Sequence, residues 1–181
     1  MNTNLLHNIY LAGAFLTLFA FEEVLYHFVK VKAEVTRKIV HVCTGLLTML
    51  FPVMLNNHWF VLLLCGSFLL ILLVSLPLGL LPSINNVGRV TRGSLLYPVI
   101  VYTCFLVQME LGSLVFYYVP ILILALCDPV AELVGKNFPW VKYQTFGHSK
   151  TISGSLGFCI SAILVTTVLL VQIEAIDAVK A

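Results

Sequence analysis

The chain has 181 residues, of which 60% are hydrophobic and only 10% charged, and its mean hydropathy is +1.03. Soluble domains carry about 25% charged residues, so this composition excludes an ordinary soluble domain. The net charge of +2 does not indicate a nucleic-acid partner, and we expect none. Because no segment is polar enough for a separate soluble domain, residues 1–181 are predicted to form a single transmembrane domain.

Apolar runs follow one another along the whole chain, each near the length of about 20 residues that a membrane-spanning helix needs. In chain order they are Leu5 to Phe21 (extended toward Val29), Ile39 to Leu55, Trp59 to Leu81, Leu95 to Val107, Leu114 to Val134 and Ile152 to Ile173. Helices are expected because lipid offers no partner for unpaired backbone groups, and the alternating pattern of a membrane barrel is absent. The sequence therefore predicts an all-α polytopic integral membrane bundle of about six transmembrane helices.

The basic residues gather in alternate loops of this arrangement. One side would hold Lys30, Lys32, Arg37, Lys38, Arg89, Arg92, Lys136, Lys142 and Lys150, and the other side only Lys180. The positive-inside rule then places the basic loops in the cytoplasm and both termini outside. We expect the chain to lie in the inner or plasma membrane of a bacterium, among membrane lipids.

Two acids interrupt the fifth apolar run near its cytoplasmic end. Asp128 and Glu132 are four residues apart, so they share one face of a helix. Carboxylates at membrane depth are costly and usually face a bundle interior or a watery cavity. Pro129 removes a backbone donor and favours a kink there. The pair is a candidate Mg²⁺ site, and an interhelical salt bridge to a loop Lys or Arg is the open alternative.

A second polar cluster runs from Gly147 to Ser155 into the last apolar run. Ser149 or Thr151 can cap that helix, and Lys150 adds a positive charge beside its N-terminus. Such an end is a plausible phosphate site. It is not a Walker A loop, since the glycines of that motif are missing. An ordinary capped helix with a positive-inside lysine explains the same residues.

Two further basic patches belong to the same predicted cytoplasmic layer. Arg92 and Gly93 precede the fourth run, and Arg37, Lys38 and His41 open the second. Each patch alone is better explained as an interfacial anchor than as a ligand site. Together with the acidic pair, they suit a nucleoside triphosphate with Mg²⁺ that meets a lipid headgroup.

The order of these patches resembles the motif series of the polyprenol kinase family, which includes phytol kinase, dolichol kinase and CTP-dependent diacylglycerol kinase and is related to phosphatidate cytidylyltransferase. The matching segments are Arg37 to His41 (RKIVH), Arg92 to Pro98 (RGSLLYP), Cys127 to Lys136 (CDPVAELVGK) and Lys150 to Ser155 (KTISGS). The resemblance covers about residues 35 to 160.

This resemblance implies a lipid kinase that transfers the γ-phosphoryl group of CTP, or of another nucleotide, to a lipid alcohol. The acceptor would be a polyprenol, a phytol-like alcohol or diacylglycerol. Asp128 would hold Mg²⁺ or accept the hydroxyl proton, with Glu132 as its partner and Lys150 as the third catalytic residue. The nucleotide and its phosphates would be bound by Arg37, Lys38, His41, Arg92, Gly93, Gly135, Lys136, Thr151, Gly154 and Ser155.

Two other functions stay open at this point. Family members often carry Glu in the last motif where this chain has Ser153, which weakens a phosphatidate cytidylyltransferase that would make a CDP-lipid. A small transporter or a structural membrane subunit could use the acidic pair as an ion relay. The sequence has no internal symmetry and its polar residues crowd one side, which argues against transport.

Overall fold

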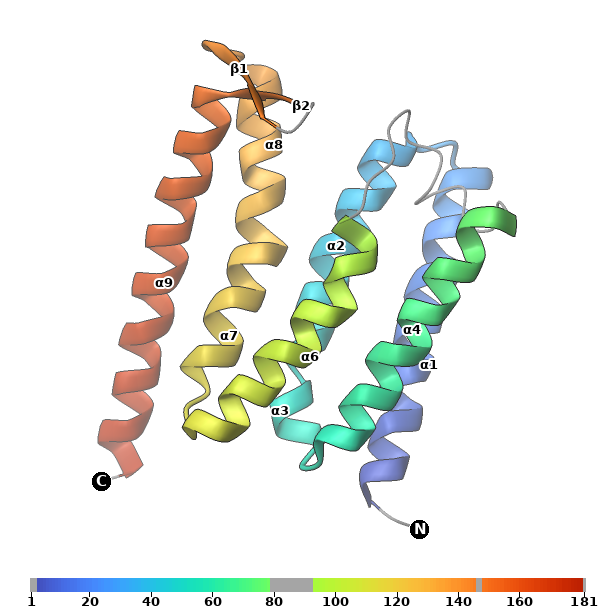
Figure 1. Ribbon diagram of the computed structural model, residues 1–181, viewed down its shortest axis with the longest axis vertical. Helices are drawn as coiled ribbons and strands as arrows, with labels where there is room; N and C mark the ends of the chain where they lie inside the picture. Colours follow the sequence, from blue (N-terminus) through green and yellow to red (C-terminus); the bar gives the residue numbers. More distant parts are fainter. Residues whose placement is uncertain (1–2, 79–92, 146–147, 181) are drawn as a thin grey trace. The chain divides into compact units, whose positions relative to one another are not determined.

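A computed structural model describes residues 3–78, 93–145 and 148–180 of the chain (Figure 1). The elements in chain order are α1 (Thr3–His27), α2 (Ala33–Thr48), α3 (Phe51–Met54), α4 (His58–Leu78), α6 (Gly93–Leu111), α7 (Val115–Leu122), the π-helix η1 (Ile123–Cys127), α8 (Asp128–Asn137), β1 (Lys142–Thr145), β2 (His148–Thr151) and α9 (Ile152–Lys180). The predicted all-α membrane bundle is confirmed.

Most of these helices are long and apolar enough to cross a membrane. Within the described residues, five segments meet that condition: Asn4–His27, Glu34–Met54, His58–Ser75, Val115–Asn137 and Ile152–Ile173. The remaining predicted span corresponds to a shorter apolar helix, Leu95–Leu111. Which side of the membrane holds the two termini stays a prediction.

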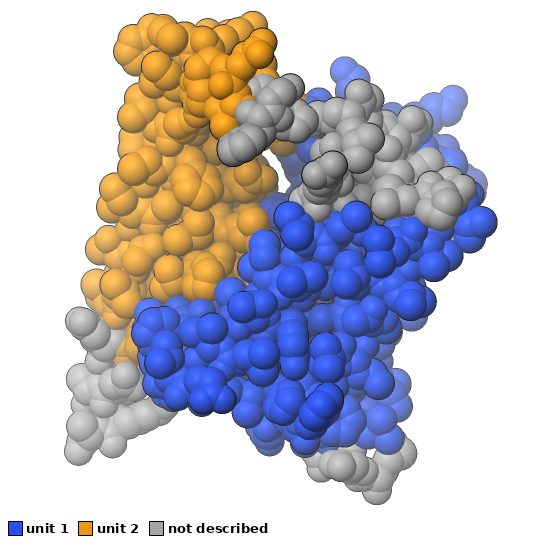
Figure 2. All heavy atoms as spheres, viewed as in Figure 1, with its two compact units in different colours: residues 1–117 blue, residues 118–181 orange. Residues whose placement is uncertain are grey.

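The chain divides into two compact units, Met1–Tyr117 and Tyr118–Ala181, which we call the N-terminal and C-terminal units (Figure 2). In the N-terminal unit, α1 packs against α2 and α4, and α4 packs against α6. Aromatic rings fill the space between these helices. Phe15 of α1 contacts Phe51 of α3 edge-on, with ring centroids 6.1 Å apart, and lies 4.9 Å from Phe68 of α4.

Polar side chains are also buried in the N-terminal unit. Glu22 of α1 is 1% exposed, and Thr36 of α2 and Ser75 of α4 are buried as well. Tyr117 donates a hydrogen bond of 2.7 Å from its hydroxyl to the carbonyl of Thr48, the last residue of α2. That carbonyl has no partner within its own helix, so this bond satisfies a buried helix end.

The C-terminal unit is a helical hairpin. Residues 118–137, which comprise the rest of α7 with η1 and α8, run in one direction. Helix α9 returns alongside them and packs against both η1 and α8 (Figure 1). The two strands between α8 and α9 pair in antiparallel register, with Tyr143 opposite Lys150 and Lys142 opposite Thr151. The expected polar loop between the last two spans therefore contains a small β-hairpin.

Candidate active site

Asp128 stands where the helix changes its geometry. The five residues before it form the π-helix η1, and Asp128 and Pro129 begin α8. Pro129 has no N–H to donate to the carbonyl one turn earlier, so the normal hydrogen-bond ladder cannot continue through this point. This π-helical turn directly precedes the point at which Pro129 predicts a kink, and such turns often lie at functional sites.

The two acids differ in their surroundings. Glu132 is bound by Lys136 of the next turn, whose Nζ lies 2.6 Å from Oε1 of Glu132. The side chain of Asp128 is exposed and makes no hydrogen bond or ion pair with any residue that the structure describes. Asp128 is thus the open carboxylate of the pair. Glu132 forms a salt bridge with a lysine of its own helix, and the alternative of an interhelical salt bridge stays open for it.

Glycines bring α8 and α9 into close contact. A Cβ atom on Gly135 would lie 2.6 Å from Oγ1 of Thr151, and one on Gly154 would lie 2.9 Å from the carbonyl oxygen of Ala131. One turn further along α9, a Cβ on Gly157 would meet the side chain of Val134 at 3.2 Å. Small residues of this kind let two membrane helices approach through their backbones. The structure gives Gly135 and Gly154 a role in packing, and their approach to a nucleotide stays a prediction.

Hydroxyl groups organise the beginning of α9. Oγ1 of Thr151 accepts the backbone N–H of Gly154 at 3.2 Å, so Thr151 caps the helix as predicted, whereas Ser149 lies in β2. Ser153 donates to the carbonyl of Phe138, the residue that ends α8. Ser155 shares a hydrogen bond of 2.7 Å with the hydroxyl of Tyr143. The hydroxyls of Thr151 and Ser155 are therefore already engaged within this unit.

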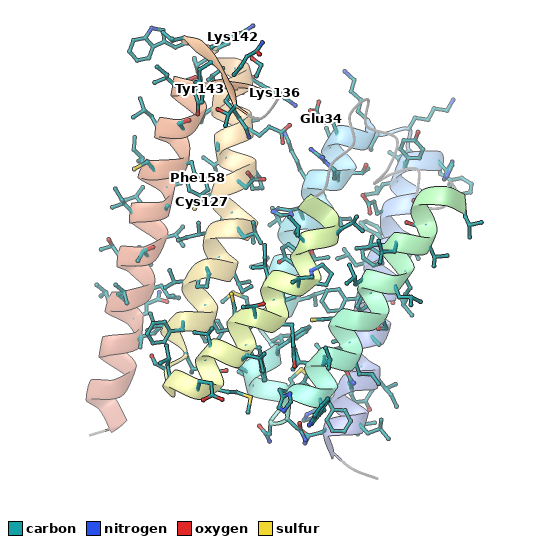
Figure 3. The ribbon with its side chains drawn as sticks, viewed as in Figure 1. Glu34, Cys127, Lys136, Lys142, Tyr143 and Phe158 are labelled. Atoms are coloured by element: carbon teal, nitrogen blue, oxygen red, sulfur yellow. The ribbon has the colours of Figure 1, made fainter. Side chains whose placement is uncertain are left out.

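The two lysines of this site are placed differently. Lys136 reaches toward Glu132, whereas Lys150 lies in β2, and its exposed side chain makes no hydrogen bond or ion pair with any other described residue. Lys150 stands opposite Tyr143 in the hairpin. In Figure 3, Lys136, Lys142 and Tyr143 gather at the end of the α8–α9 pair where the hairpin lies. The side chain of Lys150 is thus open, whereas that of Lys136 is paired, and binding of a phosphate by Lys150 stays a prediction.

The first two motifs meet in the N-terminal unit. Arg37, Lys38 and His41 lie on α2, half-buried, and the ring of His41 contacts Tyr97 of α6 edge-on at 5.5 Å. Gly93 is the first residue of α6, and Arg92 lies outside the described residues. The structure therefore pairs the first motif with the second, and the third with the fourth. A single site that contains all four stays a prediction.

A divalent metal ion would find few protein ligands here. Within the described part of the chain, no group of three or more His, Cys, Asp or Glu side chains is placed to hold a metal ion. Mg²⁺ is often bound by only one or two carboxylates, with phosphate oxygens and waters completing its coordination. The open carboxylate of Asp128 fits that pattern, and Glu132 fits it when Lys136 releases it.

The sequence did not predict the structural roles of three residues. Glu22 directly follows the first predicted apolar run, in its extension toward Val29, yet it is buried. Tyr143 and Ser153 hold the hairpin and the end of α8 to α9. The signal for Glu22 was available, because a carboxylate inside an apolar run needs a partner. No sequence pattern shows that the other two residues contact these elements.

Comparison with known proteins agrees with the motif series. A phytol kinase from Synechocystis is 35% identical to this chain over 139 residues, which are 76% of this chain and 59% of the relative. The chain belongs to the polyprenol kinase family. The chain spans less than two thirds of the length of this phytol kinase. No family model matches the chain, and no solved structure matches it.

Proposed function

We propose that this protein is a membrane lipid kinase that transfers the γ-phosphoryl group of CTP, or of another nucleotide, to a lipid alcohol at the cytoplasmic face. The acceptor would be a polyprenol, a phytol-like alcohol or diacylglycerol. The observation that carries the proposal is the open carboxylate of Asp128, at a π-helical turn inside a membrane-spanning segment. The similarity to a phytol kinase supports an alcohol acceptor.

The depth of Asp128 favours a lipid over a soluble acceptor. Asp128 precedes Gly135 by seven positions in α8, which places it about 10 Å along the helix axis from the level of Gly135, in the direction of η1. The span continues from Asp128 to Asn137. Because half of the hydrocarbon core measures about 15 Å, the hydroxyl of a lipid can reach this level without leaving the bilayer.

Each residue would have a simple task. Asp128 would accept the proton of the lipid hydroxyl or help to hold Mg²⁺, and Glu132 would be its partner. Lys150, beside the capped start of α9, would bind phosphate oxygens, as would Lys136. Bound Mg²⁺ would supply charge that neutralises the phosphates. Phosphoryl transfer needs mainly positioning and charge neutralisation, which such groups provide.

Membranes from cells that express the chain allow a direct test, with Mg²⁺ and CTP labelled at either the α or the γ phosphate. Candidate acceptors are phytol, farnesol, dolichol, diacylglycerol and phosphatidate, with membranes from cells lacking the chain as the control. We expect label from the γ position on an alcohol, and the preferred acceptor would name the substrate. Competition by unlabelled ATP and UTP would identify the nucleotide.

Transfer of the α label onto phosphatidate would overturn the proposal, because that reaction is the one a phosphatidate cytidylyltransferase performs. Absence of both transfers above the control membranes would also contradict it. The two enzymes differ in which phosphorus atom the acceptor oxygen attacks, so the position of the label separates them without further assumptions.

A further inference from the structure

The connection between α8 and α9 exposes large apolar side chains beside the membrane spans. Phe138 is 69% exposed, Trp140 65% and Val141 53%, and all three follow directly on α8. Apolar groups gathered on a surface in this way mark contact sites for proteins or membranes. Because α8 and α9 both belong to membrane-spanning segments, the surface nearest to these side chains is that of the bilayer.

The same connection carries positive charge without compensation. Lys142 and Lys150 are exposed in the two strands, and the sequence contains no Asp or Glu from residue 133 through residue 173. The side chain of Lys142 forms no ion pair or hydrogen bond among the residues that the structure describes. Aromatic rings beside unpaired lysine side chains favour a partner in which an apolar layer lies next to an anionic layer.

Hydrogen bonds hold this connection in one arrangement. The backbone N–H of Ile152 donates to the carbonyl of Val141 at 3.0 Å, and Ser153 donates to the carbonyl of Phe138. Val141 has a φ of +40°, which a β-branched residue rarely adopts. The hairpin lies across the ends of α8 and α9, with Lys142 at its outer side (Figures 1 and 3). The exposed side chains are thus presented by an ordered turn.

We propose that residues 138–145 form a membrane-surface anchor that binds the headgroups of anionic phospholipids. Trp and Tyr are enriched where headgroups meet the hydrocarbon core, because their rings are apolar and their N–H or O–H groups are polar. Trp140 and Phe138 would enter that layer, and Lys142 would contact lipid phosphates. A lysine near an anionic surface strengthens attraction to it.

Fluorescence of Trp140 in the reconstituted full-length chain tests the anchor. The protein has two Trp residues, so Trp59→Phe leaves Trp140 as the only emitter. Vesicles of phosphatidylcholine and phosphatidylglycerol would carry a nitroxide near the headgroup on one lipid or the other. We expect nitroxide-labelled phosphatidylglycerol to quench Trp140 more strongly than labelled phosphatidylcholine, and salt to reduce the difference.

Substitution of Lys142 provides the matched comparison. Lys142→Gln is expected to lower the preference for the anionic lipid by about five-fold, the effect of one lysine near such a surface. Lys180→Gln, at the opposite end of α9, is expected to leave it unchanged. Equal quenching by both lipids, or free access of aqueous acrylamide to Trp140 without lipid quenching, would overturn the proposal. The quenching experiment contains neither nucleotide nor lipid alcohol. A result that contradicts the anchor would therefore leave the kinase proposal untouched.

Discussion

Gly135 of α8 and Gly154 of α9 face each other so closely that a Cβ atom on either would lie 3.4 Å from the Cα of the other. This contact joins the third and fourth sequence motifs within the C-terminal unit. It also fixes the start of α9, where Thr151 and Lys150 lie, against α8, which carries Asp128 and Glu132. The glycines thus determine how the acidic and basic parts of the candidate site are placed.

Gly154→Ala is expected to destabilise the protein by about 1–3 kcal/mol, the usual cost of overpacking. The added methyl group would lie 2.9 Å from the carbonyl of Ala131, a backbone atom that cannot move alone. Unfolding by SDS in mixed micelles would measure the loss. The control is Gly66→Ala in α4, where nothing lies within 4 Å of the new Cβ. Equal stability of the Gly154→Ala variant and the unmodified chain would contradict the close contact.

Tyr117→Phe removes the hydroxyl that binds the carbonyl of Thr48 at 2.7 Å. We expect a loss of about 1 kcal/mol, in the range measured for hydrogen bonds between membrane helices. The same SDS titration would detect it. Tyr10→Phe, at a tyrosine that is 60% exposed, is the control and should change nothing. If both variants behave alike, the buried hydrogen bond does not contribute to stability.

Lys136→Gln is expected to lower the Mg²⁺ concentration needed for half-maximal activity by about two-fold. The physical reason is that Lys136 neutralises Glu132, and such a pair four residues apart is worth about 0.3–0.5 kcal/mol. Titration of the phosphoryl-transfer rate with Mg²⁺ would measure the change. Because Lys136 is also proposed to bind phosphate, a rise in the nucleotide KM is expected as well. An unchanged Mg²⁺ requirement would contradict the effect of the pair formed by Lys136 and Glu132.

The membrane spans could be predicted closely because bilayer thickness sets their length. The third run was expected to begin at Trp59 and α4 begins at His58; the last run was expected to begin at Ile152, as α9 does. The second span was placed too late, since α2 starts at Ala33 and includes Arg37 and Lys38. Long basic side chains can extend away from the apolar core toward water. A membrane helix can therefore continue through a basic segment of low hydropathy, as α2 does.

The candidate site was predictable in its residues but not in its contacts. Spacing placed Asp128 and Glu132 on one face, yet it could not show that Lys136 binds only the second of them. The hairpin was missed because its strands have four residues each and read as a polar loop. The packing of Gly135 on Gly154 depends on how two helices cross, which a single sequence does not reveal.

The central claim is that the carboxylate of Asp128 serves phosphoryl transfer, and the most direct measurement is the rate at which Asp128→Asn moves γ-label from the nucleotide to the lipid alcohol. The account predicts a fall of about 100-fold to 10,000-fold, the usual contribution of a general base, with membrane insertion intact. Glu110→Gln, an exposed acid near the end of α6, should keep its rate. Full activity in Asp128→Asn would contradict the account.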